Sequence, residues 1–383
     1  MKKTLYYLLL LLIIASCNNN TERTKKMSDT DLTQLFVNIK NKDSIALKKM
    51  IDKTNVNSFD TSGVNLLSRA VITGDFNIVK ILMDMGANPN LTNKTKMSTT
   101  PLMMASGYKS LDIANYLLKN GADVDIQDGN GDPVIHWSAY YGNIPFTKLM
   151  LEKGAKTDLK SIHSNGVMQV ALKEYQDSIV DLLIDYKISI FKVDPKNIAI
   201  LDAVKQNNIN AVKSLLNENN LNSRDDAGNT LLITASSKGY SDIVKYLVDK
   251  GALIDALNPV GQTALNKAIY FGNNKIAKYL ISKNADINLT DERFVLLPLV
   301  AAVRGNNLEM GRLLLKNGAD INRIDSINSF SPIMWATAYQ NKEFIQLLLQ
   351  YKPDLTIISK YNATVFDMTK DTGILKLLKN RKD

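Results

Sequence analysis

The feature that most constrains the fold of this chain is a sequence motif that recurs about every 33 residues along almost its whole length. Each copy has a first apolar run, a second apolar run and, in most copies, a closing Gly-Ala or Asn-Ala pair. One position in the first run, usually a small residue, marks each copy, and the markers stand at 37, 70, 105, 138, 171, 203, 235, 268, 301, 336 and 368. A segment this short cannot bury its apolar face alone, so the period predicts a stack in which neighbouring repeats share a core.

The residue types within each repeat predict two short helices. A Thr or Ser before the first run can cap a helix with its hydroxyl, and Pro fits the first helical turn, as in Thr100-Pro101. The apolar residues that follow recur at helical spacing. The glycines after the second run can take the left-handed conformation that ends a helix: Gly86, Gly121, Gly154, Gly251 and Gly318.

The period, the Thr-Pro-Leu-His-like openings and the Gly-Ala-Asp-Val-Asn-like endings together resemble the ankyrin repeat. The resemblance implies an all-α ankyrin-repeat solenoid over residues 30–383, with about eleven repeats, each a helix-turn-helix followed by a β-hairpin loop. The first and last repeats are atypical, as terminal caps are expected to be. Repeats five and six lack the opening signature, so we expect a degenerate joint near residues 186–197.

The N-terminus reads as an export signal. Two lysines precede an apolar run from Leu8 to Ile14 that is too short to span a bilayer, and small residues follow. The ending Ile14-Ala15-Ser16-Cys17 resembles the lipobox of bacterial lipoproteins, and Cys17 is the only cysteine in the chain. We therefore expect a lipoprotein signal peptide at 1–16, and a lipidated Cys17 that begins a flexible tether at 17–29. The alternative is a plain secretory signal with a chance cysteine.

The resemblance to bacterial lipoproteins also carries an expected location. Asn18 follows the cysteine where an aspartate would stand for inner-membrane retention in enterobacterial lipoproteins, and no acidic surface-export tag follows. We expect a protein of the bacterial cell envelope, lipid-anchored in the outer membrane and facing the periplasm.

Composition argues against several classes of function. The chain has 47 basic and 38 acidic residues, and the surplus of 9 is spread along it without a Lys/Arg block, whereas nucleic-acid binding needs concentrated positive charge. One cysteine excludes a thiolate zinc site, and two histidines leave little for metal or acid/base chemistry. We expect no nucleic-acid partner, no metal and no cofactor.

The two histidines have structural explanations. His136 stands in the slot of the histidine in the family's Thr-Pro-Leu-His turn, where the resemblance implies a ring bonded to nearby backbone. His163 lies in a polar loop without a partner at catalytic spacing, so we expect it to be exposed.

Two further patterns look like chemistry but are better explained as turns. The pairs Asp123/Asp125 and Asp286/Asn288 could be paired carboxylates or calcium ligands, yet they recur once per repeat, which favours turn chemistry. Gly129-Asn130-Gly131 resembles half of a phosphate loop but has no strand before it. We find no catalytic constellation.

What remains is a surface for binding. The resemblance implies a concave face built from hairpin tips and first helices, and aromatic residues favoured at interfaces occupy slots after the first apolar run. They are Tyr108, Tyr140, Tyr141, Tyr270, Phe271 and Tyr339. Lys94 and Lys96, in the longest loop, would form a basic rim. The alternative is that these rings pack between repeats, while Trp137 and Trp335 are expected in the core.

These observations lead to one hypothesis and two alternatives. The hypothesis is a membrane-anchored, non-catalytic protein–protein interaction scaffold that binds an unknown protein partner on its concave face. The first alternative is a glycan- or peptidoglycan-binding envelope protein, since aromatic rings also stack on sugars. The second is an envelope enzyme, which would need acid/base or metal groups that the sequence does not supply.

Overall fold

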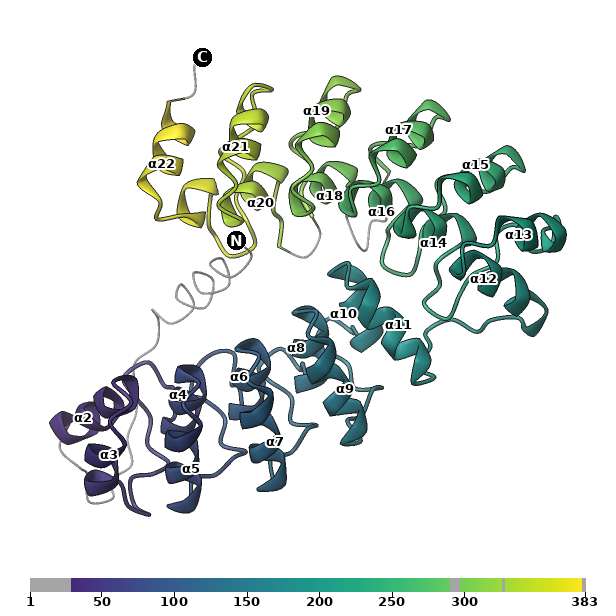
Figure 1. The fold of residues 1–383 in the computed structure, drawn as a ribbon. Helices are drawn as coiled ribbons and strands as arrows, with labels where there is room; N and C mark the ends of the chain where they lie inside the picture. The colour runs from purple at the N-terminus through teal and green to yellow at the C-terminus, as the bar shows by residue number, and fades with distance from the viewer. Residues whose placement is uncertain (1–28, 290–296, 326–327, 381–383) are drawn as a thin grey trace. The chain divides into compact units, whose positions relative to one another are not determined.

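The computed structural model describes residues 29–289, 297–325 and 328–380, and within these ranges the chain forms 21 α-helices and two short 3-10 helices (Figure 1). The described residues divide into two compact units, one ending at residue 188 and the other beginning at residue 189. The predicted signal peptide, Cys17 and all but the last residue of the predicted tether lie outside the described residues. No helix in the described part of the chain is long and apolar enough to cross a membrane.

The first compact unit holds five helix pairs. They are α2 (Asp29–Lys40) with α3 (Ser44–Met50), α4 (Leu66–Thr73) with α5 (Phe76–Asp84), α6 (Pro101–Gly107) with α7 (Leu111–Lys119), α8 (Val134–Tyr140) with α9 (Ile144–Glu152), and α10 (Val167–Lys173) with α11 (Asp177–Asp185). First helices pack against first helices and second helices against second helices, so each pair contacts only its neighbours.

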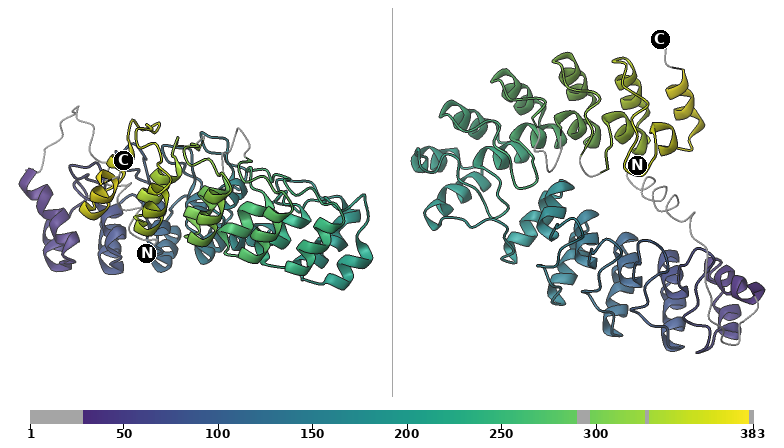
Figure 2. Two further views of the ribbon diagram at one scale, coloured as in Figure 1. Left: turned by 90° about the horizontal axis from the view of Figure 1, so that it is seen from above. Right: turned by 180° about the vertical axis from the view of Figure 1, so that it is seen from behind.

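The second compact unit continues the pattern with six more pairs (Figure 2). They are α12 (Ile198–Lys205) with α13 (Ile209–Leu215), α14 (Leu231–Lys238) with α15 (Ser241–Asp249), α16 (Ala264–Tyr270) with α17 (Asn274–Ser282), α18 (Pro298–Arg304) with α19 (Leu308–Lys316), α20 (Pro332–Ala338) with α21 (Lys342–Leu349), and the 3-10 helix η2 (Val365–Met368) with α22 (Thr372–Lys379). A further 3-10 turn, η1 (Pro195–Asn197), leads into α12. The predicted all-α stack is confirmed, with one helix pair for each marker position.

The helices begin and end as their sequences predict. The Thr100 hydroxyl accepts a hydrogen bond from the Met103 amide at 3.2 Å and so caps α6, and Pro101 occupies its first turn. Gly86 and Gly121, just after α5 and α7, have φ of +92° and +88°. Because that conformation is strained for any residue with a Cβ, these positions favour glycine.

The loops between pairs contain less strand pairing than the expected β-hairpins. Among the described residues they contribute isolated antiparallel bridges, at Phe59–Asn65, Gln127–Pro133 and Arg224–Thr230, and no extended strand. Side chains close these turns instead: Asp60 Oδ1, for example, accepts the amides of Ser62 and Val64 at 2.9 and 3.0 Å. Backbone amides that donate to a carboxylate are not free to form hydrogen bonds between strands.

A second set of side chains links seven repeats to the repeat that follows. An Asn or Asp oxygen accepts a backbone amide 31 to 33 residues further along the chain, at 2.8 to 3.0 Å. The acceptors are Asn57, Asn90, Asp125, Asn222, Asp255, Asn288 and Asn322. We call these seven bonds the inter-repeat links.

Repeat six departs from this pattern. The corresponding positions before α12, Ile190 and Phe191, carry no side-chain acceptor. At its end Asn220 accepts the Asn217 amide and donates to the Leu215 carbonyl, at 2.8 and 2.9 Å, as Asn55 does with Asp52 and Met50 in repeat one. Repeat six thus ends like the first repeat of the chain. The boundary between the compact units, at residues 188 and 189, falls within the stretch where the joint was expected.

Candidate partner-binding surface

Backbone hydrogen bonds join the hairpin tips of successive repeats. The Lys94 amide donates to the Gly63 carbonyl at 2.7 Å, and the Gly129 amide donates to the Met97 carbonyl at the same distance. The Ile162 amide continues the series to Asn130 at 2.8 Å. These tips are therefore fixed by their neighbours, which gives their loops a defined position for binding.

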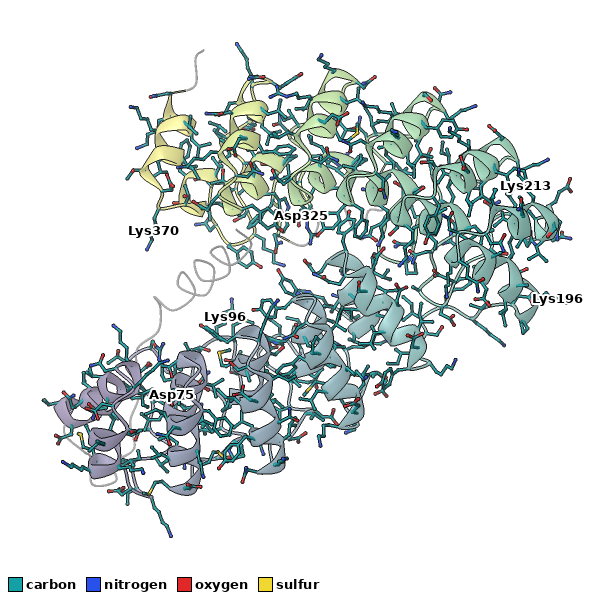
Figure 3. The ribbon with its side chains drawn as sticks, in the orientation of Figure 1. Asp75, Lys96, Lys196, Lys213, Asp325 and Lys370 are labelled. Atoms are coloured by element: carbon teal, nitrogen blue, oxygen red, sulfur yellow. The ribbon has the colours of Figure 1, made fainter. Side chains whose placement is uncertain are left out.

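Aspartates in the hairpins also bond to side chains of the first helices. Trp137 Nε1 donates to Asp128 Oδ2 at 3.0 Å, and Trp335 Nε1 donates to Asp325 Oδ2 at 2.9 Å (Figure 3 labels Asp325). In other repeats Arg69 and Thr234 take the place of tryptophan. Sequence reasoning missed these bonds, although the spacing of nine or ten residues from Asp to its donor could have indicated them.

Three of these carboxylates, Asp128, Asp225 and Asp325, are buried, and burial raises the pKa of Asp128 and of Asp225. Hydrogen bonds from nearby amides oppose the rise: those of Asp132 and Asn130 at Asp128, and those of Asn229 and Ala227 at Asp225. The oxygens of each carboxylate accept hydrogen bonds from its own turn and helix, so its role is to hold the hairpin.

In repeats three and four the predicted aromatics both pack and face solvent. Tyr108 and Tyr141 are the C-cap residues of α6 and α8. A Cβ placed on Gly107 would lie 3.5 Å from the Tyr141 ring, so Tyr141 covers the end of the preceding first helix. Tyr140 packs edge-on against Tyr141 with centroids 5.5 Å apart and remains 37% exposed. Tyr141 therefore contacts the preceding repeat, while Tyr140 remains exposed to solvent.

The aromatics of the second compact unit behave similarly. Tyr270 and Phe271 meet edge-on at 5.1 Å, and Phe271 is exposed. Tyr339 stacks on Trp335 at 5.6 Å, and the Arg304 guanidinium lies over the same indole at 5.6 Å. Trp335 is only partly buried, whereas Trp137 is buried as predicted.

A cluster around Trp335 was not predicted. Phe330 packs edge-on against Trp335 and Tyr361, at 5.3 and 6.3 Å, and Tyr361 is 55% exposed. The Tyr361 hydroxyl is 3.2 Å from Asn328 Oδ1. Tyr361 comes from repeat eleven, whose opening is so degenerate that alignment of the repeats gave no reason to single it out.

The two lysines of the longest loop differ in their surroundings. Lys94 Nζ lies 4.4 Å from the centroid of the Phe59 ring, in a cation–π contact with the preceding hairpin. Lys96 is exposed at the loop tip (Figure 3), and its carbonyl lies so close to Gly129 that a Cβ there would collide with it. Of the two lysines, Lys96 is thus the one that faces solvent without a cation–π contact.

The other chemical candidates resolve as structure. Asp123 Oδ1 accepts the Asp125 amide, and Asp286 Oδ1 accepts the Asn288 amide, each at 2.8 Å, while Asp125 and Asn288 form inter-repeat links. Turn chemistry is confirmed for both pairs. Within the described ranges no group of three or more His, Cys, Asp and Glu side chains could hold a metal ion.

His136 is buried as a structural residue, but its partner differs from the expected one. Its Nδ1 lies 2.8 Å from Asp132 Oδ1, so the ring contacts a carboxylate and not backbone. The reason is that Asp132, four residues earlier, ends the hairpin beside the first turn of α8. His163 is exposed, as expected.

The burial of Lys173 was also missed. Lys173 ends α10 at the position that Tyr140 holds in α8, is 7% exposed, and donates from Nζ to Asn165 Oδ1 at 2.7 Å. Burial lowers the pKa of Lys173 to about 8. Since lysine is ordinarily exposed, sequence alone gave no signal for this burial.

The fold and the surface define a class of protein: a stack of short helix pairs whose hairpin tips and first helices form a fixed, aromatic-bearing surface. A family model described as ankyrin repeats (3 copies) matches residues 5–128, 102–194 and 200–291, and one described as ankyrin repeats (many copies) matches residues 299–349. The chain belongs to the ankyrin-repeat family.

Its relatives are diverse. The chain is 28% identical to the putative ankyrin repeat protein L371 of Acanthamoeba polyphaga mimivirus over 61% of its own length and 34% of that protein's. It is 32% identical to palmitoyltransferase AKR1 of Lachancea kluyveri over 39% of its length and 21% of that protein's, and 25% identical to human Rabankyrin-5 over 68% and 23%. The chain thus spans about a third or less of each of these relatives.

The buried lysine leads to a prediction about pH. Its pKa is about 8 in the folded chain and about 10.4 when unfolded, so the unfolded chain binds more protons between these values and stability rises with pH there. Lys173→Met removes this dependence. The stability of Lys173→Met relative to the parent chain should fall by roughly 2 kcal/mol between pH 7 and pH 9.5, measured by urea unfolding. The exposed Lys119→Met serves as the control, and a difference that is the same at both pH values would contradict the buried cation.

Proposed function

We propose that the chain is a non-catalytic scaffold that binds a protein partner through its hairpin tips and the aromatic residues at the ends of its first helices. The observation that carries this proposal is the combination of exposed rings with a fixed backbone. Tyr140 and Phe271 are about 40% exposed, on helices whose hairpins are tied to their neighbours or to their own helix. Fixed aromatic anchors lose little entropy on binding, which is why interfaces favour them.

The proposed contact area centres on repeats three and four, where Tyr108, Tyr140 and Tyr141 lie near the end of α6 and α8 and Lys94 and Lys96 occupy the preceding loop. Tyr270, Phe271 and Tyr339 form a second proposed contact area in the second compact unit. The ankyrin-repeat family supports an interaction role in general, and the particular partner belongs to the proposal.

The two alternatives have less support. A sugar stacks on a free ring face. The indole of Trp335 already stacks on Tyr339 and lies under the Arg304 guanidinium, which argues against sugar binding there. The transferase activity named for one relative is that of a protein of which only 21% aligns with this chain. Since ankyrin repeats are interaction modules, we infer a chain without catalytic activity of its own.

We further propose that acylation of Cys17 tethers this scaffold to the outer membrane of a bacterial envelope, on the periplasmic side. The support is the lipobox-like Ile14-Ala15-Ser16-Cys17 and the lone cysteine. Two or three acyl chains make a stable anchor where one chain binds only marginally.

Partner binding can be tested with the tyrosines of repeats three and four. Tyr108→Ala combined with Tyr141→Ala should weaken capture of the partner from a membrane extract more than tenfold while helical circular dichroism is retained, because buried anchors cost about 2 kcal/mol or more when truncated. Tyr140→Ala, at an exposed ring, should weaken capture without lowering the melting temperature. Tyr351→Ala, an equally exposed ring after α21, is the matched control.

Two results would contradict this assignment. If the double variant loses its melting transition while Tyr140→Ala still captures normally, the rings serve packing between repeats. If every variant captures as well as the parent chain, the partner site lies elsewhere on the stack.

The anchor has a separate test. Cys17→Ala should move the protein from the membrane fraction to the soluble fraction after cell lysis, because the acyl chains attach at that sulfur. Mass spectrometry of the parent protein should show an acylated N-terminal cysteine. An unchanged detergent partitioning of Cys17→Ala would rule out the lipid anchor and leave the scaffold proposal untouched.

A further inference from the structure

A pattern of opposite charges recurs in the sequence of successive second helices. The fifth residue of one second helix is a Lys or Arg, and the second residue of the next is an acid, in four places: Lys80 with Asp112, Lys213 with Asp242, Lys278 with Glu309 and Arg312 with Glu343. In α17 and α19 this becomes an ion pair, with Lys278 Nζ 2.6 Å from Glu309 Oε1.

Between α15 and α17 the pairing is inverted. Lys245 is the fifth residue of α15, and the second residue of α17 is Lys275 where an acid would be expected. Lysine in the first turn of a helix is opposed by the helix dipole, and two cations at neighbouring positions repel each other. Neither ammonium forms an ion pair with a carboxylate of the described residues, and both side chains are exposed.

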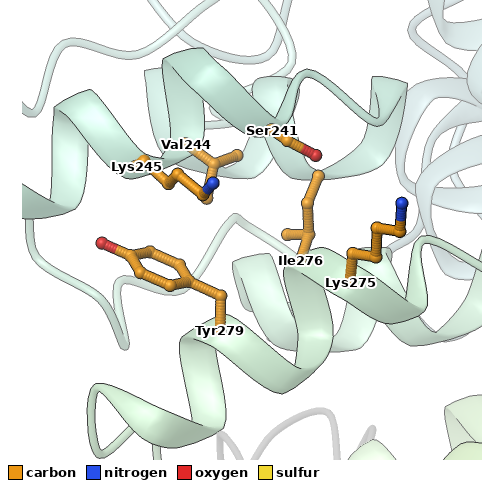
Figure 4. Close-up of a pocket in the computed structure, with 6 residues that line it drawn as sticks. All are labelled: Ser241, Val244, Lys245, Lys275, Ile276 and Tyr279. Atoms are coloured by element: carbon orange, nitrogen blue, oxygen red, sulfur yellow. The ribbon is translucent and has the colours of Figure 1, made fainter.

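These two lysines line a pocket of about 320 Å³ between the helices (Figure 4). Ser241, Val244 and Lys245 come from α15, and Lys275, Ile276 and Tyr279 come from α17, so that the ammonium groups flank an apolar floor. The Ser241 hydroxyl makes no hydrogen bond within the described part of the chain and is a further donor.

We propose that this pocket binds the phosphate group of a phosphate monoester. Two cations without a carboxylate are matched by a dianion, and a phosphate monoester carries close to two negative charges at neutral pH, whereas a single carboxylate carries one. Phosphate also supplies acceptor oxygens for both ammonium groups and for the hydroxyl. The pocket is larger than a phosphate group, so Val244 and Ile276 can contact the carbon atoms to which the phosphate is esterified.

The proposal explains the exception at Lys275. An acid there would pair with Lys245, as Glu309 pairs with Lys278, and would fill the site with an internal salt bridge. Lys275 leaves that position open to an external anion. The monoester could be a soluble small molecule or a lipid headgroup such as that of phosphatidic acid, since the two share the same recognised group.

The test uses the full-length chain and glycerol 3-phosphate in isothermal titration calorimetry at pH 7.5 and low salt. The parent chain should bind one equivalent, and Lys275→Glu should weaken binding at least tenfold because it restores the internal pair. Lys160→Glu, which makes the same charge change in an exposed turn of the first compact unit, should bind within twofold of the parent. Affinity should fall at pH 5.5, where the monoester loses its second charge.

A second measurement separates folding from binding and one ligand source from the other. Lys275→Glu should melt no lower than the parent chain, because an acid suits the first turn of α17. Vesicles of phosphatidylcholine with phosphatidic acid should retain the Cys17→Ala chain, which lacks the proposed acyl anchor, more than pure phosphatidylcholine vesicles do if the ligand is a headgroup, and equally if it is a soluble ester. Absence of binding to both glycerol 3-phosphate and phosphatidic acid, or equal binding by Lys275→Glu, would overturn the proposal.

Discussion

The structure depends on the hydrogen bond that a backbone amide of one repeat donates to an Asn or Asp side-chain oxygen of the preceding repeat. Asn90, for example, reaches the Asp123 amide, and Asp125 reaches the Lys156 amide, each at 2.8 Å. The apolar helix faces hold the repeats together, and these directional bonds fix the spacing of one repeat against its neighbour. With the register set, the hairpin tips meet and their backbone bonds can form, which places every surface residue.

The same bonds explain why stability and function can vary independently along the chain. Each repeat is held only by its neighbours, so a change in one repeat is felt locally. Repeat six lacks the acceptor before its first helix and ends with the Asn-closed turn seen in repeat one. Charged residues on the second helices can likewise differ from repeat to repeat without disturbing the core, and Lys275 is such a difference.

The architecture could be predicted from sequence because each of its determinants is local. The hydroxyl caps, the small residue of the first helix and the glycine after the second recur in register, so a fixed period already defines the helix pairs. Particular side-chain contacts, within a repeat and between repeats, were harder to assign. The tryptophan-to-aspartate bonds, the burial of Lys173 and the pocket beside Lys275 each depend on which side chain stands next to which in the folded stack. His136 shows the same limit, since its structural role was predicted and its partner, Asp132, was not.

The central claim is that the rings at the ends of the first helices contact a protein partner. The most direct measurement is photo-crosslinking in cells from a photoreactive amino acid placed at Tyr140, with Tyr351 as a position of equal exposure, 37%, outside the proposed surface. The account predicts a discrete adduct of one protein from position 140, identified by mass spectrometry, and none of that protein from position 351. Adducts of the same protein from position 351 alone, or no adduct from position 140, would contradict it.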